Sequence, residues 1–237
     1  MYRPEDHIKS QLGLHWYRNA GAWADQKILE CPLSQLDGLI IKEEYVKGAC
    51  IDPRNIVGTS HARYNSGMTW RDFLHGGKRI GRNLAKLEKS STYYDDPKGF
   101  IDNHDTWHVV EIDGKLYSSS SNHRSVIAKF RAHEQLVTKQ KIHSLKCYTT
   151  NRNAQFQYDK LQEMYLPGQR DFGTEKKLIS DDGRTQTYVT VVRCHLGARN
   201  PPVVELPLAV AASTVAEKNC AYRLLYRLHP KLWDAIR

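Results

Sequence analysis

One short stretch of the sequence gathers the side chains best suited to bind an anion. Residues 118–125 read Ser-Ser-Ser-Ser-Asn-His-Arg-Ser and combine hydroxyls, an amide, an imidazole and a guanidinium. A helical periodicity of apolar residues begins at Val126, so a helix is expected to start directly after them. The first turn of a helix has unpaired backbone N–H groups and a partial positive charge, and both suit phosphate. The sequence therefore predicts a phosphate site here, with Arg124 as its main side-chain donor.

The surrounding sequence predicts the elements that position this stretch. Residues 107–112 and 115–118 have a strand-like pattern, and Asp113-Gly114 between them is typical of a tight type I′ turn. We therefore expect a β-hairpin whose second strand runs through the serines into the helix. The apolar residues on one face of that helix are Val126, Ile127, Phe130 and Val137.

A basic connector lies earlier in the chain. A glycine-rich break at 75–82 separates two predicted helices, the first capped by Ser66 or Thr69 and the second ending near Lys89. The glycines match neither the Walker A spacing nor Gly-x-Gly-x-x-Gly. The cations of this connector are Lys78, Arg79, Arg82, Lys86 and Lys89, and the first four are the predicted nucleic-acid contacts. They form either a solvated helix face or a surface that contacts the phosphates of DNA.

Composition restricts the class of protein. The net charge of +9 and the pI of about 9.3 favour nucleic acid, a nucleotide or another acidic partner. The five cysteines are widely spaced without a Cys-x-x-Cys pair, which indicates free thiols. No signal-like or membrane-spanning apolar run occurs, so we expect a cytoplasmic protein. His104 and His108 have a metal-ligand spacing, but His108 lies in a strand pattern, so no metal site is predicted.

The hairpin, polar turn and helix resemble the ParB/sulfiredoxin superfamily. In that family a Gly-x-His-Arg or Gly-Glu-Arg-Arg box opens a helix and cradles nucleotide phosphates, and residues 120–124 correspond to it. Residues 50–64 resemble the family's first strand and Gly-Thr turn, and residues 86–94 its helical connector. The resemblance covers roughly residues 40–150. It implies an α/β (α+β) fold, a mixed sheet with flanking helices, followed by a C-terminal α/β appendage.

The resemblance also implies ligand and chemistry. The ligand would be a nucleoside triphosphate such as CTP or ATP, with Mg²⁺, or the phosphates of DNA. The residues placed at the ligand are Ser120, Ser121, Asn122, His123, Arg124, Ser125, His61 and Arg63. His123 would act as acid or base. Asp105 is the carboxylate expected to act with it, and Asp52 and Asp102 are the other candidates for the catalytic carboxylate.

The sequence is compatible with several functions. Asn122 stands where sulfiredoxins have their catalytic cysteine, and an amide is no nucleophile, so sulfinic-acid reduction is excluded. The expected protein is a ParB-like protein of a plasmid, phage or integrative element that binds the phosphates of a nucleotide or of nucleic acid, nearest to fertility-inhibition members. Whether it also hydrolyses nucleotides or cuts DNA is left open. One alternative is a DNA-binding adaptor without chemistry. Another is an inhibitor of DNA-transfer machinery, docking through Trp16 and Trp23 of a helix predicted over residues 11–31.

The sequence predicts three parts: an N-terminal helical segment over 1–38, a ParB/sulfiredoxin-like domain over 39–150 and an appendage over 151–237 that packs on it. Within the appendage, the β-branched run 185–196 predicts a strand. Helices are expected over 151–166 and 208–227.

Overall fold

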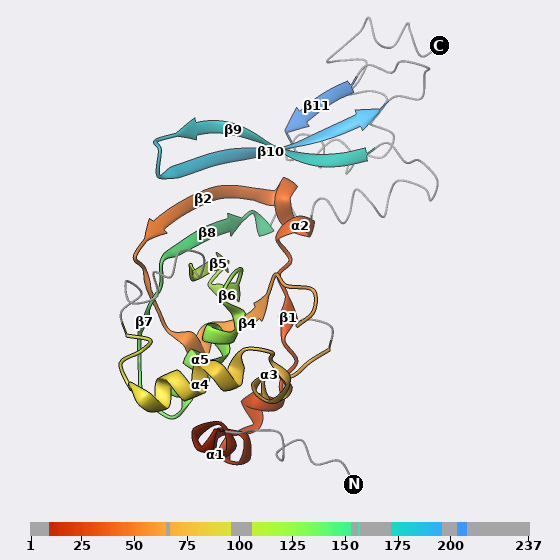
Figure 1. The fold of residues 1–237 in the computed structure, drawn as a ribbon. Coiled ribbons are helices and arrows are strands. Elements are labelled where there is room, and N and C mark those ends of the chain that lie inside the picture. Colours follow the sequence, from red (N-terminus) through yellow and green to blue (C-terminus); the bar gives the residue numbers. More distant parts are fainter. Residues whose placement is uncertain are drawn as a thin grey trace, which may run out of the picture. The chain divides into compact units, whose positions relative to one another are not determined.

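The computed structural model of the chain describes residues 10–64, 67–95, 106–152, 156, 172–195 and 203–207. The chain forms two compact units (Figure 1): one comprises Met1–Pro32 and Glu44–Cys147, and the other Leu33–Glu43 and Tyr148–Arg237. The sequence predicted divisions after residues 38 and 150. The structure instead joins the N-terminal segment to the central one, and it assigns residues 33–43 to the C-terminal unit.

The first unit is mixed α/β. Its helices are α1 (Gln11–Asn19), α3 (Trp70–Gly76), α4 (Ile80–Lys89) and α5 (Asn122–His133), with 3-10 turns η2 (Ala22–Asp25) and η4 (Pro53–Asn55). Its strands are β1 (Leu29–Glu30), β3 (Cys50–Ile51), β4 (Ile56–Thr59), β5 (His108–Ile112), β6 (Lys115–Ser118) and β7 (Gln140–Lys141). Strands β2 (Ile40–Lys47) and β8 (Ser144–Thr150) each begin in one unit and end in the other.

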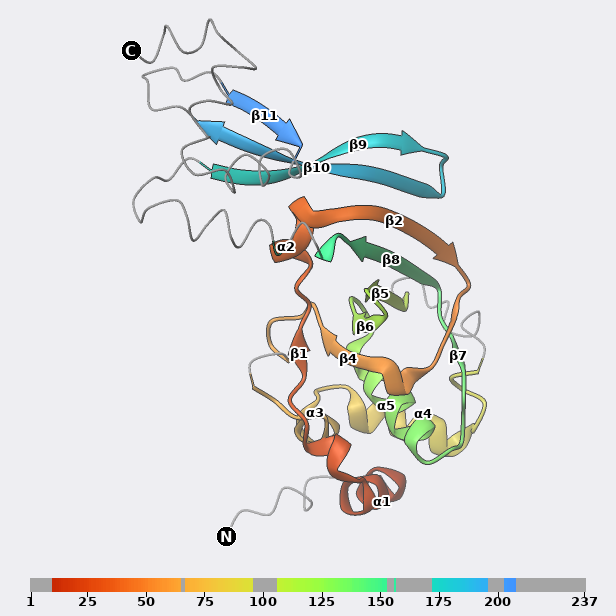
Figure 2. The same ribbon diagram turned by 180° about the vertical axis from the view of Figure 1, so that it is seen from behind.

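The sheet of the first unit brings two chain segments to a common edge. Its strands follow the order β1-β4-β6-β5-β8, and β4 runs parallel to both β1 and β6 (Figure 2). Thr59 at the end of β4 is paired with Ser118 at the end of β6. Because parallel strands end at the same edge, the segments that follow them leave the sheet side by side.

The predicted hairpin is confirmed. β5 and β6 are antiparallel, with Val109 opposite Ser118 and Ile112 opposite Lys115. Asp113 and Gly114 both have positive φ, 48° and 83°, as a type I′ turn requires. The following helix, α5, begins at Asn122 as expected and ends at His133, so it does not reach Val137.

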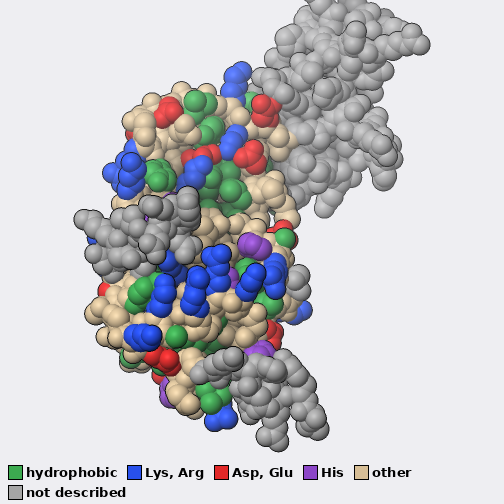
Figure 3. Space-filling model, viewed as in Figure 1, with side chains coloured by type: hydrophobic (Ala, Val, Ile, Leu, Met, Phe, Trp, Pro, Cys, Tyr) green, Lys and Arg blue, Asp and Glu red, His purple; other side chains and the backbone are tan. Residues whose placement is uncertain are grey.

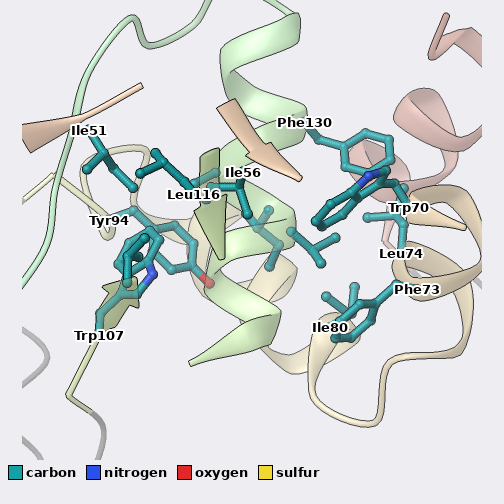
Figure 4. Packing of buried hydrophobic residues seen from close by; sticks show 14 of the residues in the cluster. Ile51, Ile56, Trp70, Phe73, Leu74, Ile80, Tyr94, Trp107, Leu116 and Phe130 are labelled. Carbon is teal, nitrogen blue, oxygen red and sulfur yellow. The ribbon is translucent and has the colours of Figure 1, made fainter. Parts of the chain in front are cut away.

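The hydrophobic core lies between the sheet and the helices (Figure 4). Trp70, Phe73 and Leu74 of α3 pack with Ile80 of α4 and Phe130 of α5. A buried group near β5 and β6 completes it: Tyr94, Trp107 and Leu116. Such continuous apolar packing holds the helices, and hence their polar ends, in fixed positions.

α5 also carries a buried cation into this core. Lys129 is only 5% exposed, and its Nζ donates to the backbone carbonyls of Arg54 (2.6 Å) and Ile56 (2.8 Å). The ammonium lies 5.6 Å from the Trp23 ring centroid and 5.0 Å from that of Trp70. Burial lowers the pKa of Lys129 to about 8.

The N-terminal segment differs from its prediction. The helix expected over 11–31 ends at Asn19, and the chain turns through η2 into an extended segment, where Ile28 N donates to Met68 O (2.9 Å). Trp16 is 1% exposed and stacks on Phe130 at 5.8 Å between ring centroids. The predicted cap of α3 is confirmed, since Thr69 and Asp72 form a capping box.

The second unit is built around one long strand. It contains α2 (Leu33–Leu36), η3 (Asp37–Leu39), β9 (Phe172–Asp181), β10 (Thr185–His195) and β11 (Val203–Pro207). β10, the predicted strand, pairs antiparallel with both β9 and β11. Lys176 on β9 forms ion pairs with Asp37 (2.7 Å) and Glu43 (2.6 Å). The helix expected over 208–227, and that over 151–166 apart from residues 151, 152 and 156, lie outside the described residues.

None of the helices in the described ranges is long and apolar enough to cross a membrane.

Candidate functional site

A pocket of about 320 Å³ opens at the N-terminus of α5. Three segments that are distant in sequence form its walls: the turn after β4, the junction of α3 and α4, and the start of α5. The residues that line it are His61, Tyr64, Lys78, Arg79, Arg82, Asn83, Ser121, Asn122, His123 and Arg124. The structure thus joins most of the predicted ligand residues and three of the four predicted nucleic-acid contacts in one site.

Ser121 sets the geometry of the helix start. Its backbone is left-handed (φ 51°, ψ 41°), a conformation that strongly favours glycine. The amides of Arg124 and Ser125 donate to its carbonyl, at 2.8 and 3.1 Å. The first amides of a helix have no acceptor within it, and the helix dipole makes this end positive. This end of α5 therefore attracts an anion in the pocket.

Two of the predicted ligand serines have another role. Ser120 Oγ donates to Thr106 O (2.6 Å), and Ser125, which is 1% exposed, bonds through its hydroxyl to Trp107 Nε1 (2.9 Å) and Ser118 Oγ (2.8 Å). Neither residue lines the pocket. The hydroxyls of Ser120 and Ser125 therefore do not supply the ligand contacts expected of them. They fix the turn against the start of β5.

Asn122 is positioned by a residue that sequence reasoning missed. The Thr59 hydroxyl lies 2.6 Å from Asn122 Oδ1 and 3.0 Å from Ser118 O, and it accepts a hydrogen bond from His61 N (3.0 Å). Thr59 is 2% exposed. This one side chain ties together the ends of β4 and β6, the start of α5 and the turn that carries His61. The Gly-Thr turn in the sequence was its only signal.

An aromatic group orients His123. Tyr64 stacks on Phe73 with 4.0 Å between ring centroids, and the His123 ring stands edge-on to both, at 5.6 and 5.4 Å. The Tyr64 hydroxyl lies 3.3 Å from His123 Nε2. His123 is therefore held half-buried at the pocket wall. Tyr64 was not among the predicted site residues, although it ends the segment that resembles the family.

His61 and Arg63 differ in position. His61 Nδ1 accepts a hydrogen bond from Arg63 N (3.3 Å), so a neutral His61 ring carries its proton on Nε2. His61 then lines the pocket as a hydrogen-bond donor. Arg63 does not line the pocket: it is exposed, and its guanidinium carbon lies 6.0 Å from the Tyr64 ring centroid. Arg63 is therefore not placed to make the ligand contact that was expected of it.

Positive charge enters the pocket from two sides. Lys78, Arg79 and Arg82 are exposed at the start of α4, whereas Arg124 on α5 is only 6% exposed. Lys86 lies outside the pocket on α4, with its Nζ 3.1 Å from the hydroxyl of Tyr93. Figure 3 shows a band of Lys and Arg side chains on this face of the molecule.

No carboxylate lines the pocket within the described part of the chain. Asp102 and Asp105 lie outside the described residues. Asp52 binds Arg54 (Oδ2 to Nη2, 2.7 Å), and this hydrogen-bonded guanidinium lowers the pKa of Asp52.

The lack of a carboxylate also decides whether the described lining could hold a metal ion. The described residues contain no cluster of three or more His, Cys, Asp or Glu side chains able to hold one. Mg²⁺ is usually bound through carboxylates and substrate phosphates together. The described lining residues therefore do not fit a protein-held Mg²⁺.

The arrangement can bind an anion through guanidinium, ammonium and imidazole donors beside a positive helix end. It also holds one imidazole, that of His123, in a fixed orientation where a proton can be moved. Comparisons of the chain with protein-family models, with curated proteins and with solved structures found no match.

Proposed function

We propose that the pocket at the start of α5 binds the phosphates of a nucleotide or of nucleic acid. One observation carries this proposal: four basic side chains, from α5 and from the start of α4, converge on one pocket whose described lining contains no acid. Such a concentration of positive charge attracts an anion to the site. Guanidinium groups suit phosphate in particular, because their paired donors match its oxygens.

We further propose that the first unit is a ParB/sulfiredoxin-like domain. Two features support this. The left-handed Ser121 stands in the box where the family has glycine, and glycine adopts this backbone conformation most readily. His61, from the segment that resembles the family's first strand and turn, lines the same pocket as His123 and Arg124. CTP or ATP is then the nucleotide to test first, and a role in the maintenance or transfer of DNA is the corresponding biological setting.

The site suggests two outcomes once phosphate is bound. Hydrolysis of a nucleotide or of a DNA strand would use His123 to move the proton and Arg124 to stabilise charge on the phosphate. Binding without chemistry is the second candidate, that of a DNA-binding adaptor. It is favoured by Asn122, which supplies no nucleophile, and by the lack of a carboxylate among the described lining residues.

The positions of the two tryptophans argue against the inhibitor function. Docking through a tryptophan stripe requires both rings to be accessible, but Trp16 is buried in the core. Trp23 is partly buried and stacks on His133, with 3.7 Å between the ring centroids.

Calorimetric titration with CTP, with ATP and with a single-stranded oligonucleotide tests phosphate binding. The variant Lys78→Ala removes one exposed pocket cation, and Lys115→Ala removes one exposed cation at the hairpin turn as the matched control. Loss of a charged hydrogen bond predicts affinity lower by about tenfold for Lys78→Ala. Lys115→Ala should bind like the parent. Equal affinity of all three proteins, or no binding of any probe by the parent, would overturn the proposal.

A further inference from the structure

α4 extends the positive surface of the pocket in one direction. Arg82, Lys86 and Lys89 follow one another at spacings of four and three residues, so they lie on one helix face. They fall within an arc of about 60° around the helix axis, and Lys78 and Arg79 lie directly before the helix. The buried residues Ile80, Leu84 and Leu87 occupy a separate arc. From Arg79 to Lys89 this face is about 15 Å long at about 1.5 Å per residue.

The one acid of α4 is turned away from this face. Glu88 accepts hydrogen bonds from Ser10 Oγ (2.7 Å) and Leu12 N (3.1 Å) at the start of α1. Its carboxylate is therefore engaged on the opposite side of the helix. The face of α4 that leads out of the pocket is basic along its whole length, and we call the exposed residues Arg82, Lys86 and Lys89 the basic ridge.

The pocket and the basic ridge differ in what they can accept. A volume of about 320 Å³ is at the small end of ligand pockets, so it admits a phosphate with its sugar but no base-paired duplex. Lys78, Arg79, Arg82 and Arg124 bring four formal positive charges to it. A phosphate monoester carries up to two negative charges near neutral pH, whereas a diester within a strand carries one. The pocket thus favours a monoester, and the open ridge favours the diesters that follow.

We infer that the site binds the phosphorylated end of a single nucleic-acid strand. The terminal monoester occupies the pocket among Lys78, Arg82 and Arg124, and the next phosphates follow the basic ridge along α4. This inference rests on the proposed function, since it names the class of ligand for the same pocket. It also explains why the cations continue to Lys89, beyond the reach of a free nucleotide.

Fluorescence anisotropy with four labelled single-stranded oligonucleotides of one sequence tests the inference. They carry a 5′-phosphate, a 3′-phosphate, both or neither, with the label attached to an internal base. One added charged contact predicts that a phosphate at one end tightens binding by about tenfold or more. Lys78→Gln, in the pocket, should abolish this advantage. Lys89→Gln, on the ridge, should weaken all four oligonucleotides alike and keep the advantage. Circular dichroism and thermal unfolding serve as the check that both variants fold.

The outcomes separate the inference from the proposed function. If the unphosphorylated strand binds as tightly as the phosphorylated ones, the inference is wrong and the pocket accepts diesters or free nucleotides. If Lys78→Gln keeps the advantage, the terminal phosphate does not occupy this pocket and the inference is again wrong. If no oligonucleotide and no nucleotide binds, the proposed function fails as well.

Discussion

The basic ridge gives a quantitative prediction for the salt dependence of nucleic-acid binding. Each phosphate contact on a single strand contributes about 0.7 to the slope of log K against log salt concentration. Arg82, Lys86 and Lys89 are all exposed on one face of α4, so each can contact one phosphate. Replacing the three by alanine should therefore reduce the slope by about 2, and each single replacement should reduce it by about 0.7.

The assay is anisotropy of a labelled single strand across a series of KCl concentrations, with Lys115→Ala as the control for lost charge. That control should keep the parental slope, because Lys115 lies at the hairpin turn and does not line the pocket. A triple variant that folds and keeps the parental slope would show that these cations only form a solvated helix face. An equal drop for Lys115→Ala would show a general effect of net charge instead.

Three further predictions concern the support of the site. Burial lowers the pKa of Lys129 to about 8, so its charged form destabilises the fold below that pH. The free energy of unfolding of the parent, measured in urea, should therefore rise by about 3 kcal/mol relative to that of Lys129→Met as the pH rises from about 8 to 10.5. A constant difference between the two proteins would refute this. Ser121→Val should lower the free energy of unfolding, measured thermally, by about 1–2 kcal/mol, whereas Ser121→Gly should not destabilise the fold. The reverse order of stability would contradict the left-handed backbone of Ser121. Thr59→Val should lower the free energy of unfolding by about 2 kcal/mol and weaken phosphate binding, because the amide of His61 loses its acceptor. If this variant bound phosphate as tightly as the parent, Thr59 would not position the site.

Local signals predicted the parts of the site that depend on neighbouring residues. The Asp113-Gly114 turn, the Thr69 cap and the start of α5 each depend on a few adjacent residues, and each is where the sequence placed it. Three cations of the connector also line the predicted pocket: Lys78, Arg79 and Arg82.

Features that depend on distant partners could not be predicted. The hydroxyls of Ser120 and Ser125 face Thr106 and Trp107, so they support the turn instead of the ligand. The helix predicted over 11–31 continued an apolar pattern, but the chain turns beyond Asn19 and becomes extended beside Met68. Pairing of this kind between remote segments leaves no periodic trace in either one.

The bond between Glu88 and the start of α1 makes the N-terminal segment part of the electrostatics of the site. Shortening the chain to begin after Leu12 would remove both donors to this carboxylate and leave a mobile negative charge on α4. The loss of a remote segment with no net side-chain charge would then weaken the attraction of the surface for polyanions. Affinity measured on such a shortened protein would understate that of the whole chain.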